Sequence, residues 1–241
     1  LHLLSRRQRQ MCIRDRHILS AAEENILAQM SEITGATNDV FKMLNNADMT
    51  FGTVTGEDGQ QVPLTHGNYI TFMESQDRGV RKAAFTNMYE AYKKLNNTLA
   101  TNYNYNAKTD VVSARIRKYD SAASAALSSG NIPMDVYRNL IKEVHNYLPV
   151  VHRYIELRKK VLGVDHLRMY DVYVPLVAAP KKKISFEEAV EIMAEGLAPL
   201  GSEYIRQVRR GIESGWVDVY ENQGKTSGAY SFGAYDSMPY I

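Results

Sequence analysis

Residues 133–163, PMDVYRNLIKEVHNYLPVVHRYIELRKKVLG, decide the fold class of this chain. Pro133 suits the first turn of a helix, where its missing N–H is not needed, and Gly163 is placed to end the helix. Pro149 lies inside the stretch and is expected to kink the helix. Apolar residues recur at helical spacing between these points. They are Val136, Leu140, Val144, Leu148, Val151, Ile155 and Leu162.

Helical patterns continue on both sides of this stretch. Ser20–Glu23 (SAAE) and Ser185–Glu188 (SFEE) have the Ser-x-x-Glu form of a capping box. The first predicts a helix to about Ser31, and the second predicts a helix to about Gly211. Residues 37–46, TNDVFKMLNN, predict another short helix that the Asn pair stops.

Between Asn68 and Gly163 the helical pattern dominates, and four apolar positions recur every four residues. They are Val80, Ala84, Met88 and Tyr92. Because residues four apart lie on one face of a helix, this spacing predicts a helix with an apolar face.

Three segments instead show the features of strands. Residues 49–65, MTFGTVTGEDGQQVPLT, predict a short β-hairpin that turns at GEDG, and Pro63 indicates an edge strand. MYDVYVPLV (169–177) predicts an extended segment. Residues 216–235 predict two strands, WVDVY and AYSFGAY, joined by the polar turn ENQGKTSG. The predicted fold class is therefore mainly α, with a small β element at the end.

The first 16 residues are interpreted as an artefact. LHLLSRRQRQMCIRDR begins without Met, carries five arginines and one acid, and resembles translated adapter sequence. Without it the net charge of the chain changes from +2 to −2. Cys12, the one cysteine of the chain, is removed with it. The remainder has no thiol for a disulfide, a thiolate zinc site or a nucleophile, which fits a reducing compartment.

The composition bounds the class of protein further. A chain of 241 residues with 44% hydrophobic residues can bury a sizeable core in one or two domains. No window approaches the roughly 18 apolar residues of a membrane-spanning helix, and the N-terminus lacks the apolar core of a signal peptide. A membrane is therefore not expected among the partners.

Two groups of residues could suggest a function that the pattern does not favour. Histidines could suggest a metal site, and basic runs could suggest nucleic-acid binding. His145 and His152 lie about 10.5 Å apart along a helix, too far to share one ion, and no His-Glu-x-x-His motif occurs in the chain. The basic runs 158–160, 181–183 and 209–210 are accompanied by acids, so they are interpreted as solvated surface. Nucleic acid is therefore not an expected partner.

The C-terminal segment GKTSGAYSFGAYDSMPYI (224–241) is the main functional candidate. GKTSG lacks the upstream glycine of a phosphate-binding loop. Tyr230 and Tyr235 lie five apart in a glycine-rich strand, so in a regular strand they would face opposite sides. Glycine between them lets another backbone come close. The pattern leaves two alternatives open, namely an edge that accepts an extended peptide and an ordinary packed hairpin strand.

Four stretches resemble oligoendopeptidase F, a family of cytosolic zinc metallopeptidases related to thimet oligopeptidase. They are LNNADMTF (44–51), LTHGNY (64–69), DVYVPLV (171–177) and VDVYENQGKTSGAYSFGAYDSMPYI (217–241). The resemblance runs in one unbroken order from about Ile18 to the end. Phe232 and Met238 stand where relatives are variable or often smaller.

The resemblance implies a mostly helical, clam-like cytoplasmic enzyme that cleaves short unstructured peptides in a deep channel. Residues 17–95 would form an N-terminal helical region with the hairpin. Residues 96–241 would begin a gluzincin-type catalytic domain, with the small β element at its end. In the family two histidines one helical turn apart and a further carboxylate hold zinc. Because that motif is absent here, we expect a truncated enzyme that binds no zinc and is inactive alone.

In the family, the stretch around GAYS borders the active-site cleft. The resemblance therefore assigns substrate contact to Tyr230, Ser231, Gly233 and Tyr235, and it assigns no catalytic or metal-binding residue to this chain. The alternative is a non-catalytic helical module whose terminal strand captures peptides. The oligomeric state is left open. A helical lobe without the rest of its enzyme is expected to expose surface suited to burial.

Overall fold

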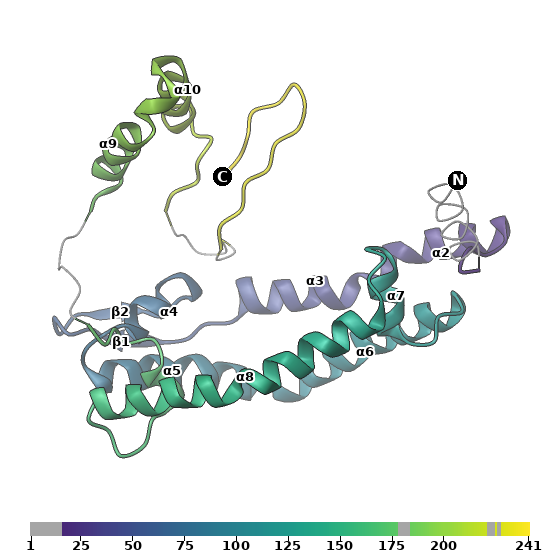
Figure 1. Cartoon of the computed structure of the whole chain (residues 1–241), viewed down its shortest axis with the longest axis horizontal. Helices are drawn as coiled ribbons and strands as arrows, with labels where there is room; N and C mark the ends of the chain where they lie inside the picture. Colours follow the sequence, from purple (N-terminus) through teal and green to yellow (C-terminus); the bar gives the residue numbers. More distant parts are fainter. Residues whose placement is uncertain (1–15, 178–183, 221–224, 226–227) are drawn as a thin grey trace.

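The structure is a computed structural model that describes residues 16–177, 184–220, 225 and 228–241. The proposed artefact, Arg16 excepted, lies outside these residues, as do Lys181–Lys183 and most of the turn 221–228. Figure 1 shows long helices along one side of the molecule and a smaller pair of helices beside the C-terminal segment on the other. The fold is mainly α, as predicted.

The side of the molecule with the long helices contains the elements from α2 to η2 in chain order. They are α2 (Ala21–Thr34), α3 (Ala36–Met43), the π-helix η1 (Leu44–Asp48), β1 (Thr53–Thr55), β2 (Gln61–Pro63), α4 (His66–Met73), α5 (Arg78–Lys94), α6 (Asn96–Ile116), α7 (Ala122–Ser128), α8 (Met134–Val161) and the 3-10 helix η2 (Met169–Asp171). The smaller side holds α9 (Phe186–Gly196), the 3-10 helix η3 (Ala198–Leu200) and α10 (Ser202–Glu213).

Local signals set several of these boundaries as predicted. The Ser20 hydroxyl accepts from the Glu23 N–H, and the Glu23 carboxylate accepts from the Ser20 N–H, so the first capping box is confirmed. The Glu188 N–H donates to Ser185 Oγ at the start of α9. Beyond α8, Gly163 adopts a φ of +63°, the left-handed conformation that glycine tolerates at the end of a helix.

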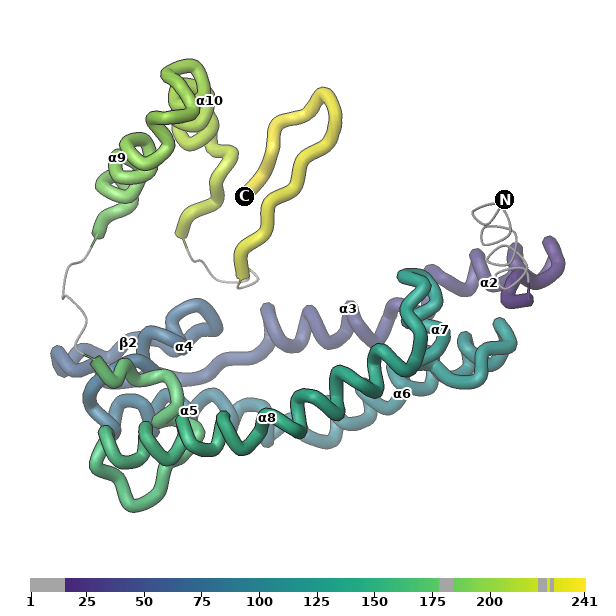
Figure 2. Tube along the Cα trace, viewed as in Figure 1, coloured from purple at the N-terminus to yellow at the C-terminus, as the bar shows by residue number. Residues whose placement is uncertain are grey.

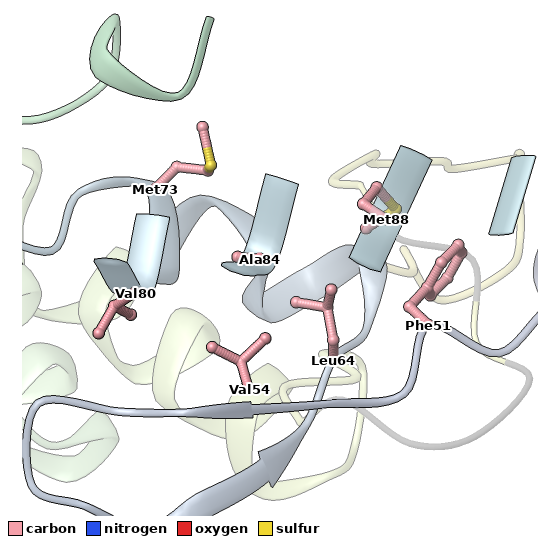
Figure 3. Close-up of a cluster of buried hydrophobic side chains, with 7 residues drawn as sticks. All are labelled: Phe51, Val54, Leu64, Met73, Val80, Ala84 and Met88. Atoms are coloured by element: carbon pink, nitrogen blue, oxygen red, sulfur yellow. The ribbon is translucent and has the colours of Figure 1, made fainter. Parts of the chain in front are cut away.

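The predicted hairpin is confirmed and covers one face of α5. Thr53 pairs with Pro63 and Thr55 with Gln61 in an antiparallel register. The tight turn requires a positive φ at Gly59, which is +77°. Val54 points into the core. Figure 3 shows this core between the hairpin, α4 and α5. Its members are Phe51, Val54, Leu64, Met73, Val80, Ala84 and Met88, which confirms the apolar face predicted for α5.

Three boundary predictions were wrong. The Asn pair at 45–46 does not stop a helix, because the chain continues through it as η1. The helix predicted from Ser185 to Gly211 is two helices: Pro199 sits in η3, and Gly201, at a φ of +95°, stands before α10. Residues 169–177 are not extended, because Asp171 closes the turn of η2 by accepting from the Arg168 N–H at 2.9 Å.

The apolar stripe of α8 is present but mostly unburied. The helix runs as one element through Pro149, and Arg158 is its one buried residue. Val136, Leu140, Val144 and Val151 are all more than half exposed. Much of the apolar surface of α8 is therefore exposed. Within the described residues, no helix is long and apolar enough to cross a membrane.

Candidate functional site

The C-terminal segment forms a narrow hairpin on itself. Phe232 and Tyr240 exchange both backbone hydrogen bonds, each 2.8 Å long, in an isolated antiparallel bridge. The turn lies at Tyr235 and Asp236, and Asp236 has a φ of +58°. Figure 2 shows this hairpin at the yellow end of the chain. The prediction of two strands at 216–220 and 229–235 was therefore wrong, because Phe232 forms only an isolated bridge, and its partner Tyr240 lies further along the chain.

The predicted strand WVDVY pairs instead with the last residue. The Ile241 N–H donates to the Trp216 carbonyl, and the Asp218 N–H donates to the Ile241 carbonyl, both at 2.9 Å. Lys225 strengthens this arrangement, since its ammonium donates to the carbonyls of Asp218 and Tyr220 at 2.8 and 2.9 Å. The C-terminal hairpin is thereby tied to the segment that leaves α10.

The four predicted substrate contacts all lie on the exposed part of this hairpin. Tyr230 and Ser231 precede the bridge, Gly233 follows Phe232, and Tyr235 is at the turn. Tyr230 is 73% exposed and Tyr235 is fully exposed. A Cβ built at Gly233 would meet nothing within 4 Å. The structure therefore brings these residues onto one accessible hairpin, but it does not place Tyr235 in a strand.

The bridge also determines which backbone groups face outward. Phe232 uses both its N–H and its carbonyl toward Tyr240. Because successive residues of an antiparallel strand point their backbone groups to opposite sides, Ser231 and Gly233 direct theirs to the outer edge. That edge is the side from which an extended peptide can add as a further strand.

An apolar hollow of about 470 Å³ lies between α9, α10 and the ends of the C-terminal segment. Trp216 is central to it. A Cβ at Gly211 would stand 2.5 Å from Trp216 Cε3, so only glycine lets the indole pack on α10. The hollow is lined by Phe186, Ala189, Val190, Met193, Tyr204, Gln207, Val208, Gly211, Ile212, Trp216, Val217, Pro239 and Ile241.

Sequence reasoning missed this hollow, although a signal was present. Phe186, Val190 and Met193 recur at helical spacing, and Tyr204, Val208 and Ile212 do the same on the next helix. The spacing shows two apolar faces. It does not show that Pro239 and Ile241 close the space between them, because that depends on the hairpin's return.

A buried charge cluster fixes the loop after α8 to α5. Asp171 accepts from Arg78 at 3.1 and 2.8 Å and from Arg81 Nη2 at 3.0 Å. Arg158 donates to the carbonyls of Asp171 and Val174 at 2.9 and 2.5 Å. The interpretation of 158–160 as solvated surface was therefore wrong for Arg158, because the loop backbone covers it. The interpretation holds for Arg209, which pairs with Glu191 in an exposed ion pair.

Burial by itself raises the pKa of Asp171. Hydrogen bonds from Arg78, the Arg168 N–H and Arg81 favour the charged form and outweigh burial, so the pKa is lowered to about 2. The carboxylate is therefore held ionised as a structural group. It shares its oxygens with these donors and is not available as a catalytic base.

The described residues do not fit a zinc ion. Among them, no group of three or more His, Cys, Asp or Glu side chains could hold a metal. His145 and His152 are both exposed on α8. No step of metal chemistry can therefore be assigned to the side chains described.

The comparisons with known proteins define the class. The family model "Peptidase family M3" matches residues 71–241, and "Oligopeptidase F" matches residues 9–51. This chain belongs to peptidase family M3.

Individual relatives agree with this. Oligopeptidase PepF of Bacillus subtilis (strain 168) is 50% identical over 93% of this chain, and Group B oligopeptidase PepB of Streptococcus agalactiae is 46% identical over 93%. The crystal structure of oligoendopeptidase-F from Enterococcus faecium matches 90% of this chain with a TM-score of 0.68 and 38% identity. The match covers 34% of PepF, 37% of PepB and 41% of the E. faecium chain, so this chain spans about a third of its curated relatives' length.

Proposed function

We propose that this chain is part of a zinc-dependent oligoendopeptidase that hydrolyses short unstructured peptides in the cytoplasm. The observation that carries the proposal is the 50% identity to oligopeptidase PepF over 93% of the chain. The match to peptidase family M3 over residues 71–241 supports it. Zinc belongs to the whole enzyme in this proposal, since the described part of this chain offers no group of side chains that could hold it.

In this proposal the C-terminal hairpin of the chain binds the peptide substrate. Tyr230, Ser231, Gly233 and Tyr235 contact the substrate. Ser231 and Gly233 do so through the outward backbone groups of the hairpin edge, which pair with an extended peptide of any sequence. The two exposed tyrosines add ring surface beside that edge. Such contacts position a peptide and perform no chemistry on it.

The division of the chain follows from the same proposal. Residues 17–95 form the N-terminal region, and residues 96–241 begin the catalytic domain. Helices α5 and α6 join at Leu95, so the proposed division falls between these two elements.

The experiment joins this chain to the missing part of a relative. In a chimera, residues 17–241 replace the matching third of B. subtilis PepF, and hydrolysis of a quenched fluorescent peptide is measured with and without a zinc chelator. We expect hydrolysis that the chelator abolishes and added zinc restores. The isolated chain, measured in parallel, is expected to bind no stoichiometric zinc and to hydrolyse nothing.

Two results would contradict the proposal. One is a chimera that unfolds cooperatively and binds zinc but hydrolyses no peptide. The other is stoichiometric zinc with turnover in the isolated chain, which would mean that the catalytic residues lie within these 241 positions. A peptide that binds the isolated chain in the absence of chimera activity would favour the non-catalytic binding module instead.

A further inference from the structure

The face of α8 opposite most of its charged residues is a continuous apolar surface. Each of its six side chains is at least 50% exposed. They are Val136, Leu140, Val144, Tyr147, Val151 and Tyr154, and they are called the α8 face below. At 1.5 Å per residue this face is about 27 Å long. An apolar surface of this extent on a chain in water indicates an interaction site.

Apart from Tyr154, whose hydroxyl accepts from Arg158 Nη1 at 3.0 Å, the α8 face is separate from the contacts that hold the helix in place. Arg158, near the C-terminal end of α8, is buried under the loop that follows the helix. The N-terminal end approaches α7. Between these ends, no residue from Asp135 to Leu157 is buried. The elements that the structure describes thus anchor the ends of α8 and bury no residue along its apolar middle.

The length of the relatives points to what covers this face. Both curated relatives named above have about two thirds of their length beyond the region that this chain matches. The α8 face lies inside the segment that the M3 family model matches, so it is part of the shared fold and not an addition to it. A polypeptide of that size can cover a 27 Å helix face with several elements.

A second copy of this chain fits the observations less well. Other exposed apolar side chains lie on separate elements, including Ile26 and Ile33 on α2 and Val111 and Ile116 on α6. A twofold dimer buries one self-complementary patch on each chain. It would leave the remaining apolar surfaces in water, whereas a large covering polypeptide can reach more than one of them.

We propose that the remaining part of the M3 peptidase packs against the α8 face. This part is a polypeptide with the chemistry of the PepF region that this chain does not match. This inference rests on the proposed function, because it takes the whole protein to be such an enzyme. It adds that the two parts are held together by apolar contact along α8, centred on Leu140 and Val144.

The test compares one substitution in two settings. Leu140→Glu is made in the isolated chain and in the PepF chimera, and the melting temperature of each is measured. In the isolated chain, where Leu140 is 60% exposed, we expect a shift below about 2 °C. In the chimera, where a buried charge would lack a partner, we expect a fall of more than about 5 °C.

His145→Glu is the matched control, because it places the same charge on the opposite side of the same helix. We expect shifts below about 2 °C in both settings. Three results would overturn the proposal. Leu140→Glu could shift the melting temperature equally in the isolated chain and in the chimera, or Leu140→Glu and His145→Glu could shift it equally in the chimera. The third result is a chimera that fails to fold. A wild-type dimer of the isolated chain that Leu140→Glu dissociates would also overturn it, because the occupant would then be a second copy.

These readouts separate the two proposals. A stable chimera that Leu140→Glu destabilises but that hydrolyses no peptide leaves the α8 interface intact and contradicts the enzyme. A chimera that hydrolyses peptide and tolerates Leu140→Glu without loss of stability contradicts the interface alone.

Discussion

Arg78 and Asp171, 93 residues apart in sequence, form a two-pronged ion pair, with Nε to Oδ1 at 3.1 Å and Nη2 to Oδ2 at 2.8 Å. The Asp171 side chain is fully buried, and Arg81 approaches the same carboxylate at 3.0 Å. This pair joins the first turn of α5 to the loop after α8. It therefore connects the predicted N-terminal region with the predicted catalytic domain.

Removing the charge of Asp171 is expected to be costly. Asp171→Asn leaves Arg81, itself buried, without its anionic partner, and breaking such a pair costs about 3–5 kcal/mol. Urea unfolding followed by far-UV circular dichroism measures the loss. Asp135→Asn is the control, because the Asp135–Arg138 pair is exposed, and a change within about 0.5 kcal/mol is expected. If Asp171→Asn lowers the free energy of unfolding no more than the control does, the cluster adds no stability.

The same carboxylate predicts an acid dependence of stability. Its pKa is lowered from 3.8 to about 2 in the folded state, so the unfolded chain takes up the proton first. The stabilisation is fully present above about pH 4 and is lost as the pH falls toward 2. Unfolding free energies at pH 5, 4, 3 and 2 check this. The difference between wild type and Asp171→Asn should shrink across that window, and a constant difference would contradict the assignment.

Gly211 is expected to tolerate no side chain. In Gly211→Ala the new Cβ falls 2.5 Å from Trp216 Cε3, so the indole must move or α10 must shift, at a cost of about 1–3 kcal/mol. Trp216 is the one tryptophan of the chain, so its emission spectrum reports the displacement directly. Gly196→Ala is the control, since a Cβ there meets nothing within 4 Å. An unchanged spectrum in Gly211→Ala would show that the indole does not pack there.

The hairpin tyrosines are expected to act in peptide binding and not in chemistry. In the PepF chimera, Tyr230→Ala and Tyr235→Ala should each raise KM about three- to tenfold, with kcat within about twofold, because the lost contact is equal in the ground and transition states. Tyr103→Ala on α6 removes a tyrosine of similar exposure and should change neither constant. An equal loss of kcat and kcat/KM at Tyr230 would instead make it a transition-state contact.

Features that depend on a few neighbouring residues were predictable from the sequence. The Ser20–Glu23 capping box, the GEDG turn and the spacing of Val80, Ala84 and Met88 each act within one helix or one hairpin. The resemblance of 217–241 to oligoendopeptidase F was also visible in the residues alone, and it indicated the family that the comparisons then showed.

The tertiary structure alone decided how distant residues meet. Residues 169–177 have the pattern of an extended segment. Asp171 nevertheless lies in a turn, because its carboxylate accepts hydrogen bonds from Arg78 and Arg81 on α5. The pairing of Phe232 with Tyr240, and of Trp216 with Ile241, depends on a chain reversal that no alternation of side chains specifies. The sequence by itself determined which surfaces are apolar, since periodicity is local. Which of them are buried was decided by the partners available, and among the described residues none buries a side chain along the middle of α8.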